Sequence, residues 1–217
     1  MTRTIVCYGD SNTHGADPAG GERLAREVRW PGVMRAALGE GYEVIEEGLS
    51  GRATVWDSPL APHHNGATYL TPCLLSHEPV DLVVIMLGTN DLKTIYGIGA
   101  PEIASAAAVL VDQARASLTG PGGTPPQVVL VAPVPLGEAT AMSEIWGFGR
   151  SLPASQQLAA MYRIVADDRG VGFLDAGSVA RVSPDDGVHL DAAAHADLGA
   201  AMAEVVRAEL ARVDTAP

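Results

Sequence analysis

Residues 82–87 of this chain form an uninterrupted apolar run, Leu-Val-Val-Ile-Met-Leu, inside a predicted strand that spans 81–87. Such a run is typical of a β-strand covered on both faces, as in a parallel sheet. Short runs rich in apolar and β-branched residues predict four further strands, at 4–8, 43–47, 127–132 and 171–175. Helical patterns separate the strands, so we expect an α/β fold with one parallel sheet and helices on both faces.

The predicted helices span residues 30–38, 72–77, 101–118, 153–169 and 191–212. Two segments without regular periodicity, 50–71 and 133–151, each follow a predicted strand. Ligands of parallel sheets bind beyond the carboxyl ends of the strands. We therefore expect these two segments, which carry Trp56 and Trp146, to wall a binding cleft.

Composition narrows the class of protein. The chain has 217 residues, of which 47% are hydrophobic, and this suits one domain, 1–217. Its formal net charge of −12 disfavours nucleic-acid and membrane-surface partners, because both carry negative charge. No apolar run approaches the ~20 residues of a membrane helix, and residues 1–4 lead straight into a strand without signal-peptide features. We therefore expect a soluble, cytoplasmic protein.

The sequence predicts neither a metal nor a cofactor. Cys7 and Cys73, the two cysteines, are placed neither as a disulfide framework nor as a zinc site, which suits a reducing compartment. His63 and His64 are adjacent, but no third ligand is evident. No Gly-x-Gly-x-x-Gly motif marks a nucleotide site.

Polar residues follow the predicted strands where those strands end. Asp10 and Ser11 follow the first strand, residues 48–52 the second and residues 88–91 the third. Residues 185–189 precede the last helix. Because the carboxyl ends of parallel strands meet at one edge, we expect the first three groups to lie together. The fourth group can reach them from the loop after the fifth strand.

Ser11 is the candidate nucleophile, because it lies where a strand gives way to a loop and a helix. A serine hydroxyl must lose its proton as it attacks, so it needs a base. His189 is the predicted base, since imidazole titrates near neutral pH. Asp186, three residues earlier, is predicted to hold the ring and its tautomer, with Asp185 as the competing carboxylate.

An acyl-transfer intermediate also needs hydrogen-bond donors for its oxyanion. The candidates are the N–H groups of Ser11 and Gly51 and the side-chain amide of Asn90. Each of these features has a structural alternative. Ser11 can simply cap a helix, and residues 88–91 taken alone are better explained as an ordinary turn. Asp10 is expected to bind main chain beside the nucleophile, without a chemical step.

The chain resembles the SGNH (GDSL-type) hydrolase family in four blocks that occur in order: Gly9-Asp10-Ser11-Asn12, Gly51, Gly88-Thr89-Asn90-Asp91 and Asp186-Gly187-Val188-His189. The family name records the Ser, Gly, Asn and His of those blocks. The resemblance implies a triad of Ser11, His189 and Asp186, and an oxyanion hole of Ser11, Gly51 and Asn90. It also implies a three-layer α/β/α sandwich around a five-stranded, flavodoxin-like parallel sheet.

Four further segments, 28–30, 46–50, 87–91 and 175–179, resemble the arylesterase and acyltransferase type of this family, which is known from mycobacteria. That type acts on small acyl esters, passes acyl groups to alcohols or peroxide, and forms octamers whose subunits restrict access to the active site. The likeness therefore implies a homo-oligomer, with the octamer as the size it suggests. The candidate substrate-binding residues are Asp10, Asn12, Trp56 and Trp146.

The predicted function is a serine esterase that cleaves small, short-acyl carboxylic esters through an acyl-enzyme on Ser11. Acyltransferase or perhydrolase activity is a further expectation from the resemblance. A carbohydrate O-acetylesterase and a thioesterase or lysophospholipase remain as alternatives with the same triad. A non-catalytic, doubly wound binding module is the distant alternative, because one fold hosts many functions.

Overall fold

The computed structural model describes residues 2–214 of the chain. Five strands form one parallel sheet in the order β2-β1-β3-β4-β5. Their bounds are β1 Arg3–Gly9, β2 Tyr42–Gly48, β3 Leu82–Met86, β4 Gln127–Ala132 and β5 Gly172–Asp175. This is the flavodoxin-like strand order of doubly wound sheets, and it confirms the predicted fold class. In such a sheet the strand order reverses between β1 and β3, and ligands bind outside the carboxyl ends at that point.

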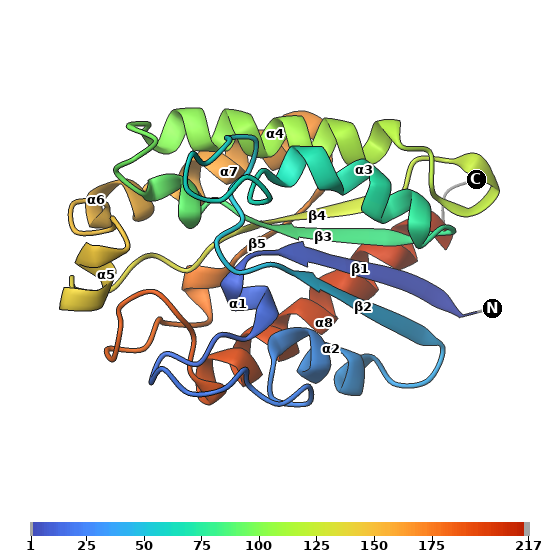
Figure 1. Cartoon of the computed structure of the whole chain (residues 1–217). Coiled ribbons are helices and arrows are strands. Elements are labelled where there is room, and N and C mark those ends of the chain that lie inside the picture. Colours follow the sequence, from blue (N-terminus) through green and yellow to red (C-terminus); the bar gives the residue numbers. More distant parts are fainter. Residues whose placement is uncertain (1, 215–217) are drawn as a thin grey trace.

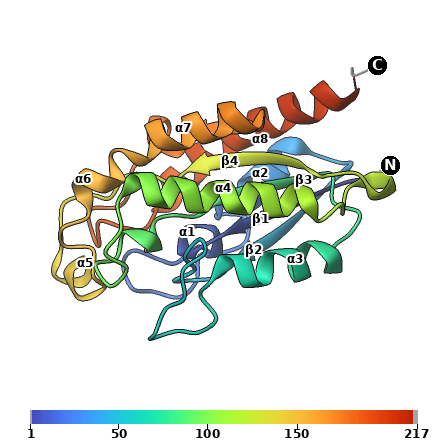
Figure 2. The same ribbon diagram turned by 90° about the horizontal axis from the view of Figure 1, so that it is seen from above.

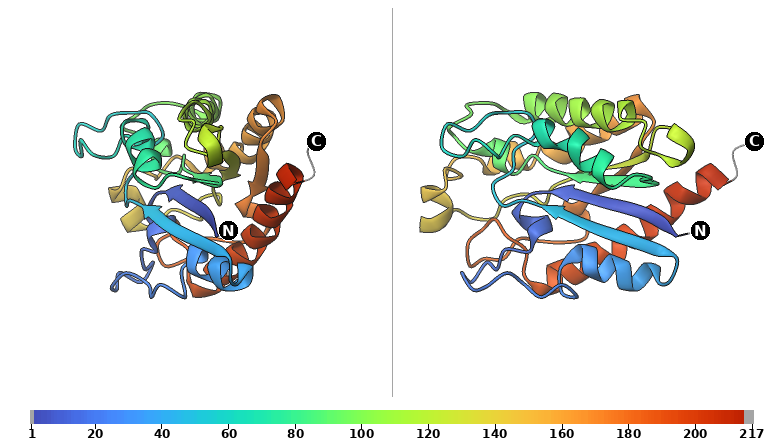
Figure 3. Two further views of the ribbon diagram at one scale, coloured as in Figure 1. Left: turned by 90° about the vertical axis from the view of Figure 1, so that its right-hand side faces the viewer. Right: turned by 45° about the vertical axis from the view of Figure 1, so that its right-hand side comes forward.

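Helices cover both faces of the sheet and make three layers (Figure 1). One face carries α3 Gly66–Ser76, α4 Ala100–Ala116 and α7 Leu158–Arg169, with α4 between the other two (Figure 2). The other face carries α1 Ser11–His14, α2 Trp30–Leu38 and α8 Ala192–Asp214, and the layers are clearest end-on (Figure 3). Shorter elements complete the chain: α5 Ala141–Ile145, α6 Leu152–Ser155, and the 3₁₀ turns η1 Asn90–Leu92, η2 Pro121–Gly123 and η3 Ala176–Ser178.

The core lies on both sides of the sheet because successive strand side chains point to opposite faces. In β1, Val6 and Tyr8 pack into the layer of α3, α4 and α7. Ile5 and Cys7 pack into the layer of α2 and α8, against Trp30. All five residues of β3 are buried, which explains its continuous apolar sequence.

Two predicted helices differ from the observed ones. The helix predicted at 72–77 begins at Gly66, because the Asn65 side chain caps it by accepting from the Ala67 N–H at 3.0 Å. Pro72 lies inside this helix rather than at its start. The Gln113 amide of α4 supports that turn by donating to the carbonyl oxygen of Ala67 at 2.8 Å. A tertiary contact of this kind leaves no local sequence pattern.

The helix predicted at 153–169 is divided into α6 and α7. The segment predicted to be irregular at 133–151 contains the short helix α5, capped by Thr140, whose side chain accepts from the Ser143 N–H. Within residues 2–214, no helix has both the length and the apolar character required to cross a membrane.

Candidate active site

A chain of hydrogen bonds connects Ser11, His189 and Asp186. The Nε2 atom of His189 lies 2.9 Å from the Ser11 hydroxyl oxygen. Its Nδ1 atom lies 2.6 Å from Oδ2 of Asp186. A neutral imidazole that donates from Nδ1 to the carboxylate presents its Nε2 lone pair to the serine hydroxyl. The sequence predicted these three residues, and the structure brings them into hydrogen-bonding distance.

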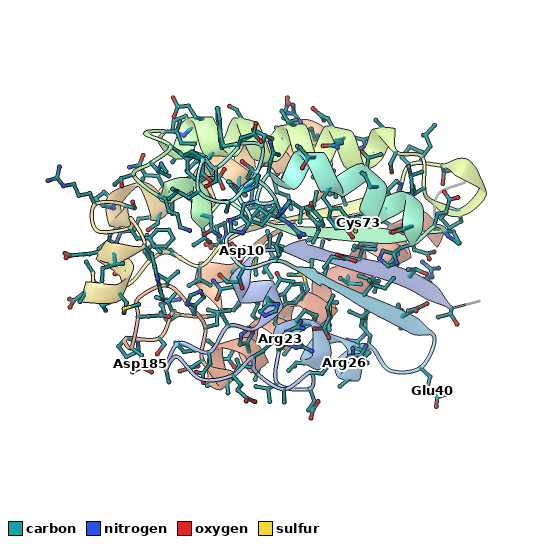
Figure 4. The ribbon with its side chains drawn as sticks, viewed as in Figure 1. Asp10, Arg23, Arg26, Glu40, Cys73 and Asp185 are labelled. Carbon is teal, nitrogen blue, oxygen red and sulfur yellow. The ribbon has the colours of Figure 1, made fainter. Side chains whose placement is uncertain are left out.

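Asp186 is held as a carboxylate. Burial opposes its charged form, but hydrogen bonds from the His189 ring and from the N–H groups of His189 and Val188 outweigh burial and lower its pKa. Both N–H groups donate to Oδ1 at 2.8 Å. Asp185, the competing carboxylate, is exposed and accepts from the Ser183 hydroxyl instead (Figure 4). The geometry therefore selects Asp186.

Ser11 begins α1 directly after β1, at the point where the strand order reverses. The side chain of Asp10 caps this helix by accepting from the Asn12 N–H at 2.9 Å. The helix lies very close to the end of β2, since a Cβ atom on Gly48 would stand 2.2 Å from the backbone nitrogen of His14. Glycine at that position lets the serine sit directly over the sheet edge.

Asn12 is buried, and both ends of its side-chain amide bond to the loop that carries His189. Its Nδ2 donates to the carbonyl oxygen of Val188 at 3.2 Å. Its Oδ1 accepts from the N–H of Leu190 at 3.0 Å. The sequence placed Asn12 among the substrate contacts. The structure instead uses it to hold the two residues that flank His189.

Asn90 follows β3 and points toward the end of β1. Its Nδ2 donates to the carbonyl oxygen of Arg52 at 3.1 Å and makes a longer contact of 3.5 Å to Oδ2 of Asp10. Asp10 is 1% exposed, and burial raises its pKa. Its carboxylate therefore contacts α1 and Asn90 inside the protein, and it is too buried to contact a substrate. Figure 4 labels it at the carboxyl end of β1.

Gly51 lies in the loop after β2 with a φ of +85°, a conformation that favours glycine. Among the described residues, no acceptor takes its N–H group, and the same holds for the N–H of Ser11. The loop is tied to η1 through Asp91, which accepts from the N–H and hydroxyl groups of Thr54. Burial raises the pKa of Asp91 to about 6, although the bonds from Thr54 oppose that rise.

Arg52 is a structural residue of the site that local sequence patterns did not predict. Its Nη1 donates to the carbonyl oxygens of Gly9 and Glu47, and its guanidinium stacks 4.1 Å over the Tyr8 ring. Its own carbonyl orients Asn90. The only sequence signal was its position next to Gly51.

A cavity of about 800 Å³ opens beside His189. The Trp146 ring meets the His189 ring edge-on, with centroids 5.5 Å apart, and borders this cavity together with His14 and Met142. Trp146 also borders a second hollow of about 400 Å³, which Gly51 lines. Trp146 therefore borders both the cavity beside His189 and the hollow that Gly51 lines.

Trp56 does not join this arrangement. It lines a separate shallow hollow against α4, together with Val55 and Pro101. Segment 50–71 therefore approaches the site through Gly51 and His64, and not through its tryptophan.

A doubly wound parallel sheet with a hydrogen-bonded serine, histidine and aspartate at its carboxyl edge defines an α/β serine hydrolase. The chain belongs to the GDSL-like Lipase/Acylhydrolase family, which matches residues 7–196, and it is a carboxylic ester hydrolase. The predicted resemblance is thus confirmed. A search of curated proteins found no match.

Solved structures agree with this family. The aryl esterase of M. smegmatis is 42% identical, with a TM-score of 0.90 over 96% of this chain and 100% of that one. The carbohydrate acetylesterase Est24 from Sinorhizobium meliloti is 41% identical, with a TM-score of 0.89 over 95% of this chain and 99% of that one. Another carbohydrate acetylesterase family member from Sinorhizobium meliloti is 42% identical, with a TM-score of 0.91 over 97% and 100%.

Proposed function

We propose that this single-domain protein, residues 1–217, hydrolyses small, short-acyl carboxylic esters with Ser11 as nucleophile, His189 as base and Asp186 as the residue that orients the base. One observation carries the proposal: the hydrogen-bonded path from the Ser11 hydroxyl through both nitrogens of His189 to Asp186. Its geometry is that of a serine-hydrolase triad.

The first half of the reaction acylates Ser11. His189 Nε2 takes the hydroxyl proton as Ser11 Oγ attacks the ester carbonyl carbon, and Asp186 stabilises the resulting imidazolium. The tetrahedral intermediate collapses when the bond to the alkoxy oxygen breaks, and His189 gives its proton to that leaving alcohol. Water then attacks the acyl-enzyme by the same route and releases the acid.

Three donors are proposed for the oxyanion: the N–H groups of Ser11 and Gly51 and the Nδ2 of Asn90. The two N–H groups have no acceptor among the described residues. One hydrogen of Asn90 Nδ2 is taken by Arg52, while the other makes only the 3.5 Å contact to Asp10. Preorganised donors of this kind stabilise the charge that develops in the transition state.

The two hollows beside Trp146 suit the two parts of a small ester, one for the acyl group and one for the alcohol. An aryl ester and an acetylated sugar remain as candidate substrates, because relatives of both kinds are about equally similar to this chain. A series of p-nitrophenyl esters of increasing acyl length, assayed beside a peracetylated sugar, separates them. Added alcohol in the same assay measures acyl transfer by the yield of new ester.

We also propose that the protein is a homo-oligomer whose contacts include the rim of the smaller hollow. Leu60 and Ile145 line that hollow and are 83% and 77% exposed, and the partly exposed Ile95 lies beside them. Large apolar side chains gathered around one opening mark an interaction surface. Light scattering tests this, and a monomer would remove the proposal. A cytoplasmic location is proposed as well, because Cys7 and Cys73 are both free and buried.

The deciding experiment is Ser11→Ala, with hydrolysis of p-nitrophenyl acetate as the assay. The variant is expected to lose activity while its circular dichroism and melting temperature stay close to those of the parent. Ser50→Ala is the matched control, because Ser50 lines the cavity but is not hydrogen-bonded to His189. Retained turnover in folded Ser11→Ala would overturn the assignment.

A further inference from the structure

A second group of reactive side chains lies on β2 and α3, outside the triad. One donor atom each from Glu47, Cys73 and His77 lies within 4.8 Å of the other two. The Nε2 of His77 is 2.9 Å from Oε1 of Glu47. Figure 4 labels Cys73 on the α3 side of the sheet, well apart from Asp10 at the catalytic edge. The catalytic steps above use none of these three residues.

The local structure explains why they converge. Cys73 lies in the last turns of α3 and His77 is its C-terminal cap residue, so the two stand one helical turn apart on one face. Glu47 lies near the carboxyl end of β2, the edge strand of the sheet. Two residues at the end of α3 and one residue of β2 therefore direct their side chains to one point.

The cluster is partly buried, but an ion from solvent can reach it. The Cys73 side chain is fully buried, whereas Glu47 and His77 are partly exposed and border solvent. The nearby cation, Arg52, does not pair with the Glu47 carboxylate. Its guanidinium bonds to the carbonyl oxygens of Gly9 and Glu47 and stacks over Tyr8.

The donor types indicate the kind of ion. Mg²⁺ and Ca²⁺ prefer shells made of oxygen. A thiolate, an imidazole and a carboxylate at one point suit a borderline-soft divalent ion, above all Zn²⁺, with water as the fourth ligand. We propose that Glu47, Cys73 and His77 form a binding site for Zn²⁺ or a similar ion that links β2 to α3.

Binding would replace the Cys73 thiol proton and the direct contact between His77 and Glu47 by bonds to the ion. Because only the folded chain brings the three ligands together, binding stabilises the folded state. No catalytic step passes through the ion. This proposal revises the expectation, drawn from the sequence, that the chain has no metal site.

Cobalt(II) is the probe, since a cobalt–thiolate bond gives a strong charge-transfer absorption that oxygen and nitrogen ligands do not. Chelator-treated, reduced protein titrated with Co²⁺ is expected to show this band, saturating at one ion per chain, and Zn²⁺ is expected to displace it. Cys73→Ala should abolish the band. Cys7→Ala is the matched control and should keep it, because Cys7 is the other buried thiol of the chain.

Glu47→Gln and His77→Ala alter partly exposed residues, so they test the site even if a cysteine variant fails to fold. Each is expected to weaken Co²⁺ binding by about tenfold or more. Zn²⁺ should raise the melting temperature of the parent but not of these two variants. Absence of the charge-transfer band in the parent, or its survival in folded Cys73→Ala, would show an ordinary ion pair beside a buried thiol and overturn the proposal.

Discussion

The Nε2 atom of His189 and the hydroxyl oxygen of Ser11 lie 2.9 Å apart, although the two residues are separated by 178 positions in the chain. Asn12, the neighbour of Ser11, bonds to the main chain on both sides of His189. The nucleophile and its base are therefore connected in two ways. One is the direct hydrogen bond, and the other is the buried side-chain amide of Asn12, which lies in the same short helix as Ser11.

Asn12→Ala is expected to lower kcat by about 100-fold while KM changes little, because the His189 loop loses both of the hydrogen bonds that Asn12 makes to its main chain. The imidazole is then held less precisely against Ser11. Steady-state kinetics with p-nitrophenyl acetate measures the split between kcat and KM. The rate at which a phosphonate ester labels Ser11 should fall in parallel, since that reaction needs the same base. A variant with unchanged kcat would show that Asn12 has no positioning role.

Asn90→Ala is expected to lower kcat by roughly 10²- to 10³-fold, the usual effect of removing one oxyanion donor. The substrate binds before the negative charge develops, so KM should stay close to that of the parent. The measurement is kcat and KM with one short-acyl ester, together with a melting curve to show that the protein is folded. An effect on KM alone would assign Asn90 to substrate binding.

His195→Asn is expected to reduce the loss of stability in mild acid. The ring of His195 is fully buried in α8, and its Nδ1 accepts from the N–H of Trp30 at the start of α2. Burial lowers its pKa from 6.5 to about 4. The unfolded chain therefore binds a proton that the folded one does not, and stability falls as the pH drops from 6.5 toward 4, by on the order of 3 kcal/mol.

Urea unfolding at several pH values, compared between the parent and His195→Asn, tests this prediction. An asparagine can still accept from the Trp30 N–H, but it does not titrate. Asp91, whose pKa burial raises to about 6, acts with the opposite sign, yet it is present in both proteins and cancels in the difference. Parallel pH profiles for the two proteins would contradict the assignment.

Glu46→Gln is expected to destabilise the fold by about 3 kcal/mol, because Glu46 is the carboxylate around which four arginines gather. They are Arg23, Arg26, Arg29 and Arg35. Glu46 and Arg29 are the buried pair, with an N–O distance of 3.2 Å and side chains that are 7% and 8% exposed. Without the carboxylate, the Arg29 charge is buried and uncompensated.

Arg26→Ala is the control for that prediction. Its side chain is 61% exposed, so its ion pair with Glu46 is screened by water and its loss should change stability by less than about 1 kcal/mol. Figure 4 labels Arg23 and Arg26 beside α2, on the face of the sheet opposite Cys73. Equal losses in the two variants, measured by urea unfolding, would contradict the distinction between the buried and the exposed pair.

Local sequence patterns predicted most of the secondary structure, because burial on both faces of a sheet requires apolar runs and helices require periodic ones. The strand at 127–132 and the helix at 30–38 match the observed bounds. The start of α3 was missed because its cap, Asn65, and its support from Gln113 are set by a loop and by another helix. Pro72, the first residue of the predicted helix, lies inside the observed one.

The candidate site was predicted from residue types in four ordered blocks, and the parallel order of the strands explains why those blocks meet. The roles of Asn12 and Trp56 were not readable in this way. Whether an amide faces a substrate or the next loop, and whether a tryptophan lines the cleft or a helix, depends on the packing of separate elements.

The sequence by itself determined the alternation of strands and helices and the identity of the groups that can do chemistry, because both are local properties of the chain. The tertiary structure alone decided which groups lie within reach of one another. Sheet order and packing of the whole core bring His189 to Ser11, and they bring His77 to Glu47 across 30 positions. No pattern along the chain records such distances, since they follow from the sum of many weak contacts on both faces of the sheet.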